Sequence, residues 1–143
     1  MENRIRVGIV DDHASYREGV AFALESEPDL LIVGEGETAH DAFRLARDHA
    51  PDVLLLDVNM PGGEINAVAS IASHCPSTKT VMLTVVDDKD EVRSAIGKGA
   101  RGYLLKGISS SELVSTIRLV NDGGSYVSPD LAVRLFMGVH GRE

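Results

Sequence analysis

The sequence contains little cysteine and fewer basic than acidic residues, and each shortage excludes a class of protein. Cys75 is the only cysteine among 143 residues, so neither an intrachain disulfide nor a cysteine-rich metal site is possible. A lone cysteine fits a reducing compartment, and we expect a cytoplasmic protein. The 14 Lys and Arg residues against 22 Asp and Glu give a net charge of −8, which repels phosphate backbones. The chain is therefore a poor nucleic-acid binder by itself, and its acidity fits a site that collects a cation.

Long apolar runs, low-complexity tracts and internal repeats are missing as well. The first apolar stretch, residues 5–10, is interrupted by Arg6 and is too short for a signal peptide or a membrane span. We therefore expect no membrane association. A hydrophobic content of 43% in 143 residues instead suits one globular domain with a single core.

Five short apolar runs alternate with segments of helical spacing. The runs are residues 5–10, 30–34, 53–56, 80–83 and 102–105. Between them, apolar residues recur on one helical face, as Val20, Ala23 and Leu24 do. This alternation implies βαβ units and a parallel sheet with right-handed connections. We predict an α/β fold, a flavodoxin-like doubly wound sandwich built as (βα)5 around a five-stranded parallel sheet, with an extra C-terminal helix.

Three pairs of residues resemble a helix capping box. Thr38 stands three residues before Asp41, Asp88 three before Glu91, and Ser109 three before Glu112. The last pair is the best match to the motif, so we expect the most complete box there.

The pattern changes after the fifth helical segment. Residues 121–124, Asn-Asp-Gly-Gly, form a helix stop, and Ser128-Pro129 supplies an N-cap with proline at the first helical position. We divide the chain into a domain at residues 1–122 and a C-terminal extension at residues 123–143 that carries a linker helix.

Polar side chains end four of the predicted strands. Asp57 follows the apolar run at residues 53–56, where a carboxylate lies at the rim of a low-dielectric core. The carboxyl ends of parallel strands lie along one edge of a sheet, so these side chains can converge. The other members are Asp11 and Asp12 after the first strand, Thr84 after the fourth and Lys106 after the fifth.

This set of side chains contains the parts for forming an acyl phosphate. Three converging carboxylates repel each other unless a cation is present, and such oxygen ligands suit Mg²⁺. With the metal bound, the carboxylate of Asp57 can act as a nucleophile on phosphorus. Lys106 adds a third positive charge, and the Thr84 hydroxyl can donate a hydrogen bond to a phosphoryl oxygen.

Each residue also has a simpler explanation. Asp11 and Asp12 can cap the next helix, Thr84 can be a satisfied strand-end hydroxyl, and Lys106 can be a solvated surface lysine. We interpret His13 as a solvent-facing residue at a helix start rather than as a metal ligand. All of these simpler explanations would have to be correct at once for there to be no site. We therefore favour the interpretation in which these residues form one functional site.

Four segments resemble the receiver domain of two-component response regulators, over nearly the whole chain. They are IVDDH at 9–13, LLLDVNMPG at 54–62, VMLT at 81–84 and GARGYLLK at 99–106. The last segment, with His13 and GGSYVSP at 123–129, resembles the NarL/LuxR-type subfamily. Residues 62–66 depart from the family pattern, because the usual Asp-Gly pair is missing and the run is one residue shorter.

The resemblance implies that Asp57 accepts a phosphoryl group from a histidine kinase in a Mg²⁺-dependent reaction. It implies no enzymatic activity beyond self-phosphorylation and self-dephosphorylation. For Tyr103, ordinary packing of a strand aromatic remains an equal alternative to a switching role. The resemblance assigns Asp11, Asp12, Asp57 and the backbone carbonyl of Asn59 to Mg²⁺, Lys106 and Thr84 to the phosphoryl group, and Thr84 and Tyr103 to a conformational switch.

The same resemblance implies how the domain would pass on its signal, through control of transcription. Members of the subfamily usually continue into a helix-turn-helix DNA-binding domain, whereas here the linker segment runs to Glu143. We expect a truncated receiver, in preference to a stand-alone one. It would dimerise on activation and control transcription through a DNA-binding domain absent here.

Three other functions stay open on this fold. A flavodoxin-like cofactor binder needs a Ser/Thr/Gly-rich loop after the first strand, where Asp11 and Asp12 would repel a phosphate. An aspartyl-phosphate phosphatase typically needs a second aspartate two residues after the nucleophile, where this chain has Asn59. A stand-alone or phosphorylation-independent interaction module is opposed only indirectly, by the complete acid set.

Overall fold

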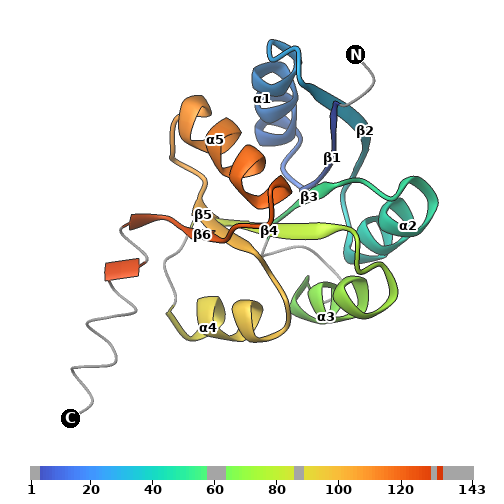
Figure 1. Cartoon of the computed structure of the whole chain (residues 1–143), viewed down its shortest axis with the longest axis vertical. Helices are drawn as coiled ribbons and strands as arrows, with labels where there is room; N and C mark the ends of the chain where they lie inside the picture. Colours follow the sequence, from blue (N-terminus) through green and yellow to red (C-terminus); the bar gives the residue numbers. More distant parts are fainter. Residues whose placement is uncertain (1–3, 58–63, 86–88, 130–131, 134–143) are drawn as a thin grey trace.

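A parallel sheet lies between two layers of helices in the computed structural model, which describes residues 4–57, 64–85, 89–129 and 132–133 (Figure 1). The strands are β1 Ile5–Val10, β2 Leu30–Gly36, β3 Val53–Asp57, β4 Lys79–Thr84, β5 Gly102–Leu105 and β6 Tyr126–Val127. The helices are α1 Ala14–Glu25, α2 Ala39–His49, α3 Glu64–His74, α4 Lys89–Gly97 and α5 Ser110–Asn121. The doubly wound α/β fold predicted from the sequence is confirmed.

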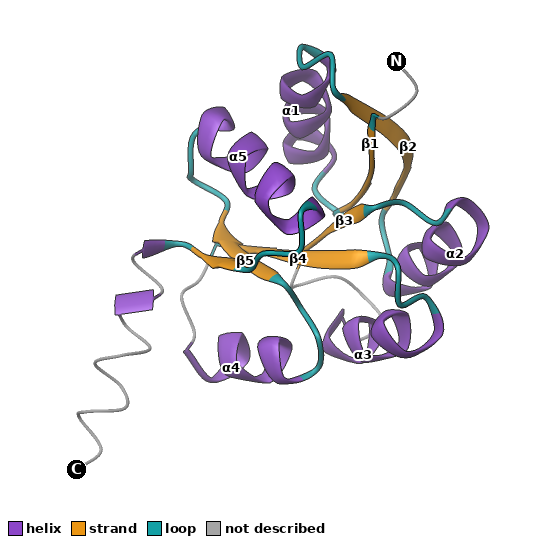
Figure 2. Ribbon diagram, viewed as in Figure 1, coloured by secondary structure: helices purple, strands orange, loops and turns teal. Residues whose placement is uncertain are grey.

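Helices cover both faces of the sheet because its central strands are apolar on both sides. Helices α1 and α5 pack on one face, and α2, α3 and α4 pack on the other (Figure 2). In β3, Val53 and Leu55 point toward α1 and α5, while Leu54 and Leu56 point toward the other layer. All four side chains are fully buried, which explains why this strand reads as an uninterrupted apolar run.

The strand order β2-β1-β3-β4-β5-β6 places a topological switch point between β1 and β3. From β1 the chain first builds outward to β2 and then returns to the other side with β3. Ligands bind at such a point, outside the carboxyl ends of the strands. Val10 pairs with Leu56 in the β1–β3 ladder, so Asp11 and Asp57 come next to each other at that edge.

The predicted count of five strands is wrong, because β6 adds a sixth at the edge beyond β5. Gly102 pairs with Tyr126 and Tyr103 with Val127, and the Ser128 N–H donates to the Tyr103 carbonyl over 3.0 Å. Two residues are too few to show a strand period in the sequence. The sheet thus continues into the predicted extension at residues 123–143, and the domain boundary after residue 122 stays a prediction.

Within the described residues the most complete capping box is at Thr38, not at Ser109 as predicted, and Asp88 lies outside those residues. The Thr38 hydroxyl accepts from the Asp41 N–H over 3.0 Å, and the Asp41 carboxylate accepts from the Thr38 N–H over 3.3 Å. Ser109 accepts from the Glu112 N–H over 3.1 Å, but the Glu112 carboxylate accepts a hydrogen bond from the Tyr126 hydroxyl over 2.8 Å. This tertiary contact with β6 uses the side chain that the motif would need.

The chain turns into a helix again after β6. The Ala132 N–H donates to the Ser128 carbonyl over 2.9 Å, so the predicted start at Ser128-Pro129 is confirmed, and the continuation of this helix lies outside the described residues. Within the parts of the chain described above, every helix is too short or too polar to cross a lipid bilayer.

Candidate functional site

Three carboxylates meet at the switch point of the sheet. Asp11 follows β1 and Asp57 is the last residue of β3, and both side chains are buried. Asp12 is partly exposed beside them. The backbone N–H of Asp11 donates to the Gly36 carbonyl over 3.0 Å, which fixes the acidic loop against the end of β2. One ligand atom from each carboxylate lies within 4.8 Å of the others, as predicted from their strand-end positions.

Lys106 is the cation that compensates this buried charge. Its ammonium lies 2.7 Å from Asp11 Oδ2 and 3.2 Å from Asp57 Oδ1, and its side chain is only 8% exposed. The Lys106 N–H donates to the Thr84 carbonyl over 2.7 Å, so the pairing of β4 with β5 sets its position. The interpretation as a solvated surface lysine is therefore wrong.

Thr84 and Tyr103 lie on the sheet face that carries α4. Thr84 ends β4 and is fully buried. Met82, two residues earlier on the same face, pairs with Tyr103, which is fully buried in the same core. Tyr103 is an interior residue because β6 covers the far side of β5. Both side chains occupy neighbouring strands on one face, and their switching role stays a prediction.

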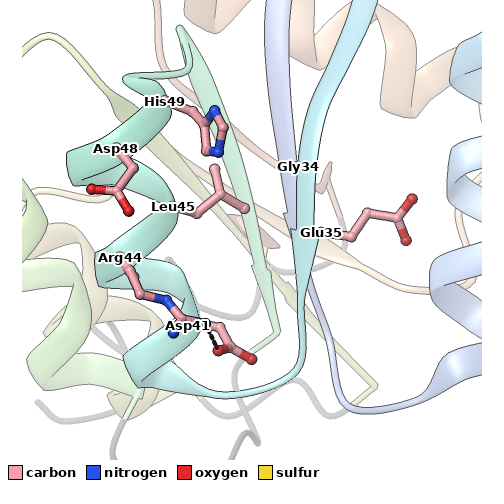
Figure 3. Close-up of a pocket in the computed structure, with 7 residues that line it drawn as sticks. All are labelled: Gly34, Glu35, Asp41, Arg44, Leu45, Asp48 and His49. Atoms are coloured by element: carbon pink, nitrogen blue, oxygen red, sulfur yellow. Dashed lines mark hydrogen bonds and ion pairs between the residues drawn. The ribbon is translucent and has the colours of Figure 1, made fainter.

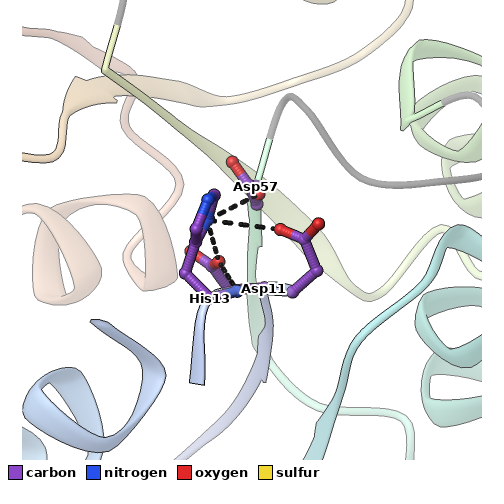
Figure 4. A group of neighbouring side chains, drawn as sticks. Asp11, His13 and Asp57 are labelled. Carbon is purple, nitrogen blue, oxygen red and sulfur yellow. Dashed lines mark hydrogen bonds and ion pairs between the residues drawn. The ribbon is translucent and has the colours of Figure 1, made fainter. Parts of the chain in front are cut away.

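His13 lies at the helix start and is largely exposed, as predicted, but its ring also contacts the acidic cluster. It is the N-cap of α1, but its side chain makes no capping hydrogen bond. The ring turns into the acidic cluster, with Nδ1 3.1 Å from Asp11 Oδ1, 3.2 Å from Asp12 Oδ1 and 3.8 Å from Asp57 Oδ2 (Figure 4). The ring is 60% exposed, so one edge faces solvent while the other faces the carboxylates.

The sequence reasoning missed two residues on the first turn of α1. The Lys106 ammonium lies 4.7 Å from the centroid of the Tyr16 ring, a cation–π contact. Burial, and then the charges of Asp11 and Asp57, raise the pKa of Tyr16 to about 12. Arg17 donates hydrogen bonds to the Asp11 carbonyl and to Glu35. Their places three and four residues after His13 are the available signal, because such spacing continues one helical face.

The comparisons with known proteins agree with this geometry. The family model described as the response regulator receiver domain matches residues 7–118. The chain belongs to this family. It is 36% identical to the transcriptional regulatory protein DegU of Brevibacillus brevis over 94% of this chain and 57% of that protein.

Two solved structures resemble this receiver domain closely. A LuxR-family two-component response regulator from Aurantimonas sp. SI85-9A1 has a TM-score of 0.89 and 30% identity, over 94% of this chain and 97% of that chain. The isolated receiver domain of RcsB from Salmonella enterica serovar Typhimurium, solved with the phosphomimetic BeF3−, has a TM-score of 0.82 and 25% identity, over 93% and 99%. The chain spans about three fifths of the length of the first curated relatives that it matches.

The carboxylates of this receiver domain fit a small divalent cation. Lys106 contacts Oδ2 of Asp11 and Oδ1 of Asp57, whereas the other oxygen of each carboxylate faces His13. One oxygen from each of the three carboxylates lies close enough to the others for them to share one hard ion. The predicted ligand Asn59 lies outside the described residues.

A second polar hollow lies away from this site, between β2 and α2. Figure 3 shows Gly34, Glu35, Asp41, Arg44, Leu45, Asp48 and His49 around a volume of about 130 Å³. Arg44 already pairs with Asp41 over 2.8 Å, and Asp41 serves the capping box. Its charged groups thus stabilise α2. His40, His49 and His74 are exposed, as the sequence predicted, and His140 lies outside the described residues.

Proposed function

We propose that this receiver domain accepts a phosphoryl group on Asp57 from a histidine kinase in a Mg²⁺-dependent reaction. The observation that carries the proposal is a buried strand-end carboxylate with different neighbours on its two sides. Asp57 Oδ1 lies 3.2 Å from the Lys106 ammonium, and Oδ2 faces the acidic cluster. Such a carboxylate can bind a metal through one oxygen while the other reacts.

The residues around Asp57 supply what phosphoryl transfer needs. An oxygen of Asp57 attacks phosphorus, a new O–P bond forms, and the bond to the donor breaks with its electron pair leaving on the donor. Lys106 neutralises charge that develops on the phosphoryl oxygens. Asp11 holds Lys106 in place over 2.7 Å. Magnesium, when bound, adds two positive charges beside the same oxygens.

The arrangement also supports a switch. A phosphoryl group adds charge and acceptor oxygens at the end of β3, next to β4. The Thr84 hydroxyl would donate to it, and Tyr103 on the neighbouring strand would repack in the space that Thr84 leaves. This is a local charge event that shifts a population between two conformations.

The proposals on cellular location, dimerisation and transcriptional output rest on the relatives. DegU is named as a transcriptional regulatory protein, and the RcsB receiver was solved with a phosphomimetic. We accordingly assign this chain a cytoplasmic role in signal transduction, with dimerisation on activation and transcriptional output through a DNA-binding domain. Its own chemistry is limited to gain and loss of the phosphoryl group.

Phosphoryl uptake from acetyl phosphate tests the proposal. The purified chain should gain one phosphoryl group by intact-mass spectrometry with Mg²⁺ and none with EDTA, and Asp57→Asn should gain none under either condition. Asp52→Asn is the matched control, because Asp52 precedes β3 and accepts a hydrogen bond from the Arg6 N–H at the opposite end of the strand. Uptake by Asp57→Asn equal to that of the unaltered chain would overturn the proposal.

A further inference from the structure

We propose that His13 is a fourth protein ligand at the acidic cluster, and that it makes the site bind divalent ions of the Mn²⁺ to Zn²⁺ series more tightly than Mg²⁺. The inference rests on the proposed function, because it concerns the metal of the same site. It goes further in naming the metal class and the residue that selects it. The observation behind it is the position of one imidazole nitrogen among three carboxylate oxygens.

The His13 imidazole lies at ligand distance from the three carboxylates. Ligand atoms about 2.1 Å from an octahedral ion lie about 3 Å apart when adjacent and about 4.2 Å apart when opposite. His13 Nδ1 lies 3.1 Å, 3.2 Å and 3.8 Å from oxygens of Asp11, Asp12 and Asp57 (Figure 4). The distances from Nδ1 thus fall in the range for ligands of one first-row ion, and the ligand atoms of the four residues all lie within 4.8 Å of one another.

Lys106 and His13 contact different oxygens of the two buried carboxylates. Lys106 contacts Oδ2 of Asp11 and Oδ1 of Asp57, and His13 contacts the other oxygen of each. The two side chains lie side by side, with the Lys106 ammonium 3.4 Å from His13 Nδ1. An ion held by His13 and the oxygens that face it would leave to Lys106 the two oxygens that the ammonium contacts.

The His13 ring is oriented toward the carboxylates and has no role in capping the helix. The His13 side chain does not cap α1, so helix formation does not explain the inward turn of the ring. The ring is 60% exposed, and its Nδ1 faces the carboxylates.

Ligand chemistry then gives the selectivity. Mg²⁺ prefers oxygen ligands and keeps several waters, so an imidazole adds little to its binding. Imidazole suits Zn²⁺, Ni²⁺, Co²⁺ and other first-row transition ions. One nitrogen added to three carboxylates therefore raises affinity for the transition ions and leaves Mg²⁺ affinity nearly unchanged.

Calorimetric titration with Mg²⁺ and with Co²⁺ tests the selectivity. His13→Ala should weaken Co²⁺ binding about tenfold or more, and should change Mg²⁺ binding by no more than about twofold. His13→Asn keeps a good N-cap residue and removes the imidazole, so it should show the same split. His40→Ala, an exposed histidine on α2, should change neither affinity.

Pulsed electron paramagnetic resonance with Mn²⁺ gives a direct readout. The unaltered chain should show coupling of bound Mn²⁺ to an imidazole nitrogen, and both His13 variants should lose it. Absence of nitrogen coupling in the unaltered chain would overturn the proposal. So would a His13→Ala variant that binds both ions more tightly, because the ring would then act only as a competing positive partner of the carboxylates.

The outcome is separable from that of the proposed function. Phosphoryl uptake in Mg²⁺ with no effect of His13 on Co²⁺ binding would remove this inference and keep the function. Nitrogen coupling without phosphoryl uptake would keep the metal assignment and remove the function.

Discussion

Neutralising Asp57 should stabilise the metal-free protein, which is unusual for a change at a buried position. With an effective dielectric constant of about 20, the Lys106 ammonium at 3.2 Å contributes about 5 kcal/mol of attraction to Asp57. Asp11 and Asp12 have oxygens within 4.8 Å. Each opposes Asp57 by about 3.5 kcal/mol on the same scale, or about 7 kcal/mol together. Repulsion therefore exceeds attraction by about 2 kcal/mol, before the cost of burying the charge.

Asp57→Asn removes this excess and leaves Lys106 paired with Asp11 at 2.7 Å. The free energy of unfolding in EDTA should rise by about 2 kcal/mol, which moves the urea midpoint by about 1 M. Saturating Mg²⁺ should stabilise the unaltered chain more than the variant, because the variant has lost a ligand, and the gap between them should shrink.

Urea unfolding followed by circular dichroism, with EDTA and with Mg²⁺, measures these differences. Asp48→Asn is the control, since Asp48 is an exposed carboxylate paired with Arg47 on α2, and it should respond to neither condition. An Asp57→Asn variant less stable than the unaltered chain in EDTA would refute the electrostatic reasoning.

Three further predictions concern the neighbours of Asp57 and one helix start. Lys106→Ala should weaken the conformational response to beryllofluoride more than it weakens Mg²⁺ binding, and equal losses in the two titrations would show its role to be wrong. The raised pKa of Tyr16 favours the neutral phenol, so stability from this group is intact below pH 10 and is lost as the pH rises toward about 12. Tyr16→Phe should remove both that alkaline loss and the step near pH 12 in the absorbance titration. Hydrogen bonds from the backbone of Glu37, and then of Thr38, lower the pKa of Asp41. The stability that the ionised Asp41 carboxylate gives the folded protein is therefore present at neutral pH and is lost as the pH falls through that lowered pKa. Asp41→Asn should flatten the acid side of the stability profile, and an unchanged profile would count against the capping box.

The sequence was enough to predict where the reacting groups meet. Asp57, Thr84 and Lys106 each follow an apolar run, and alternation of strands with helices requires a parallel sheet whose strand ends share one edge. The register of the strands then aligns their ends, since Val10 pairs with Leu56 and Thr84 pairs with Leu105. The convergence is a consequence of topology, which a single sequence can show.

Side-chain direction and short tertiary pairings were beyond the sequence. The His13 ring turns toward Asp11, Asp12 and Asp57, but a position directly after an acid pair does not determine which way a side chain points. The two-residue strand Tyr126–Val127 has no period of its own and forms because β5 offers an edge. The same strand brings Tyr126 to Glu112 and leaves the capping motif at Ser109 incomplete.

Reductive trapping of the phosphorylated residue tests the central claim most directly. Borohydride converts an aspartyl phosphate to homoserine, so peptide mapping after treatment with acetyl phosphate and Mg²⁺ locates the acceptor. Homoserine should replace aspartate at position 57 only, in the peptide that contains β3. Homoserine at position 11 or 12 instead, or at no position in a sample that has gained phosphate, would contradict Asp57 as the acceptor.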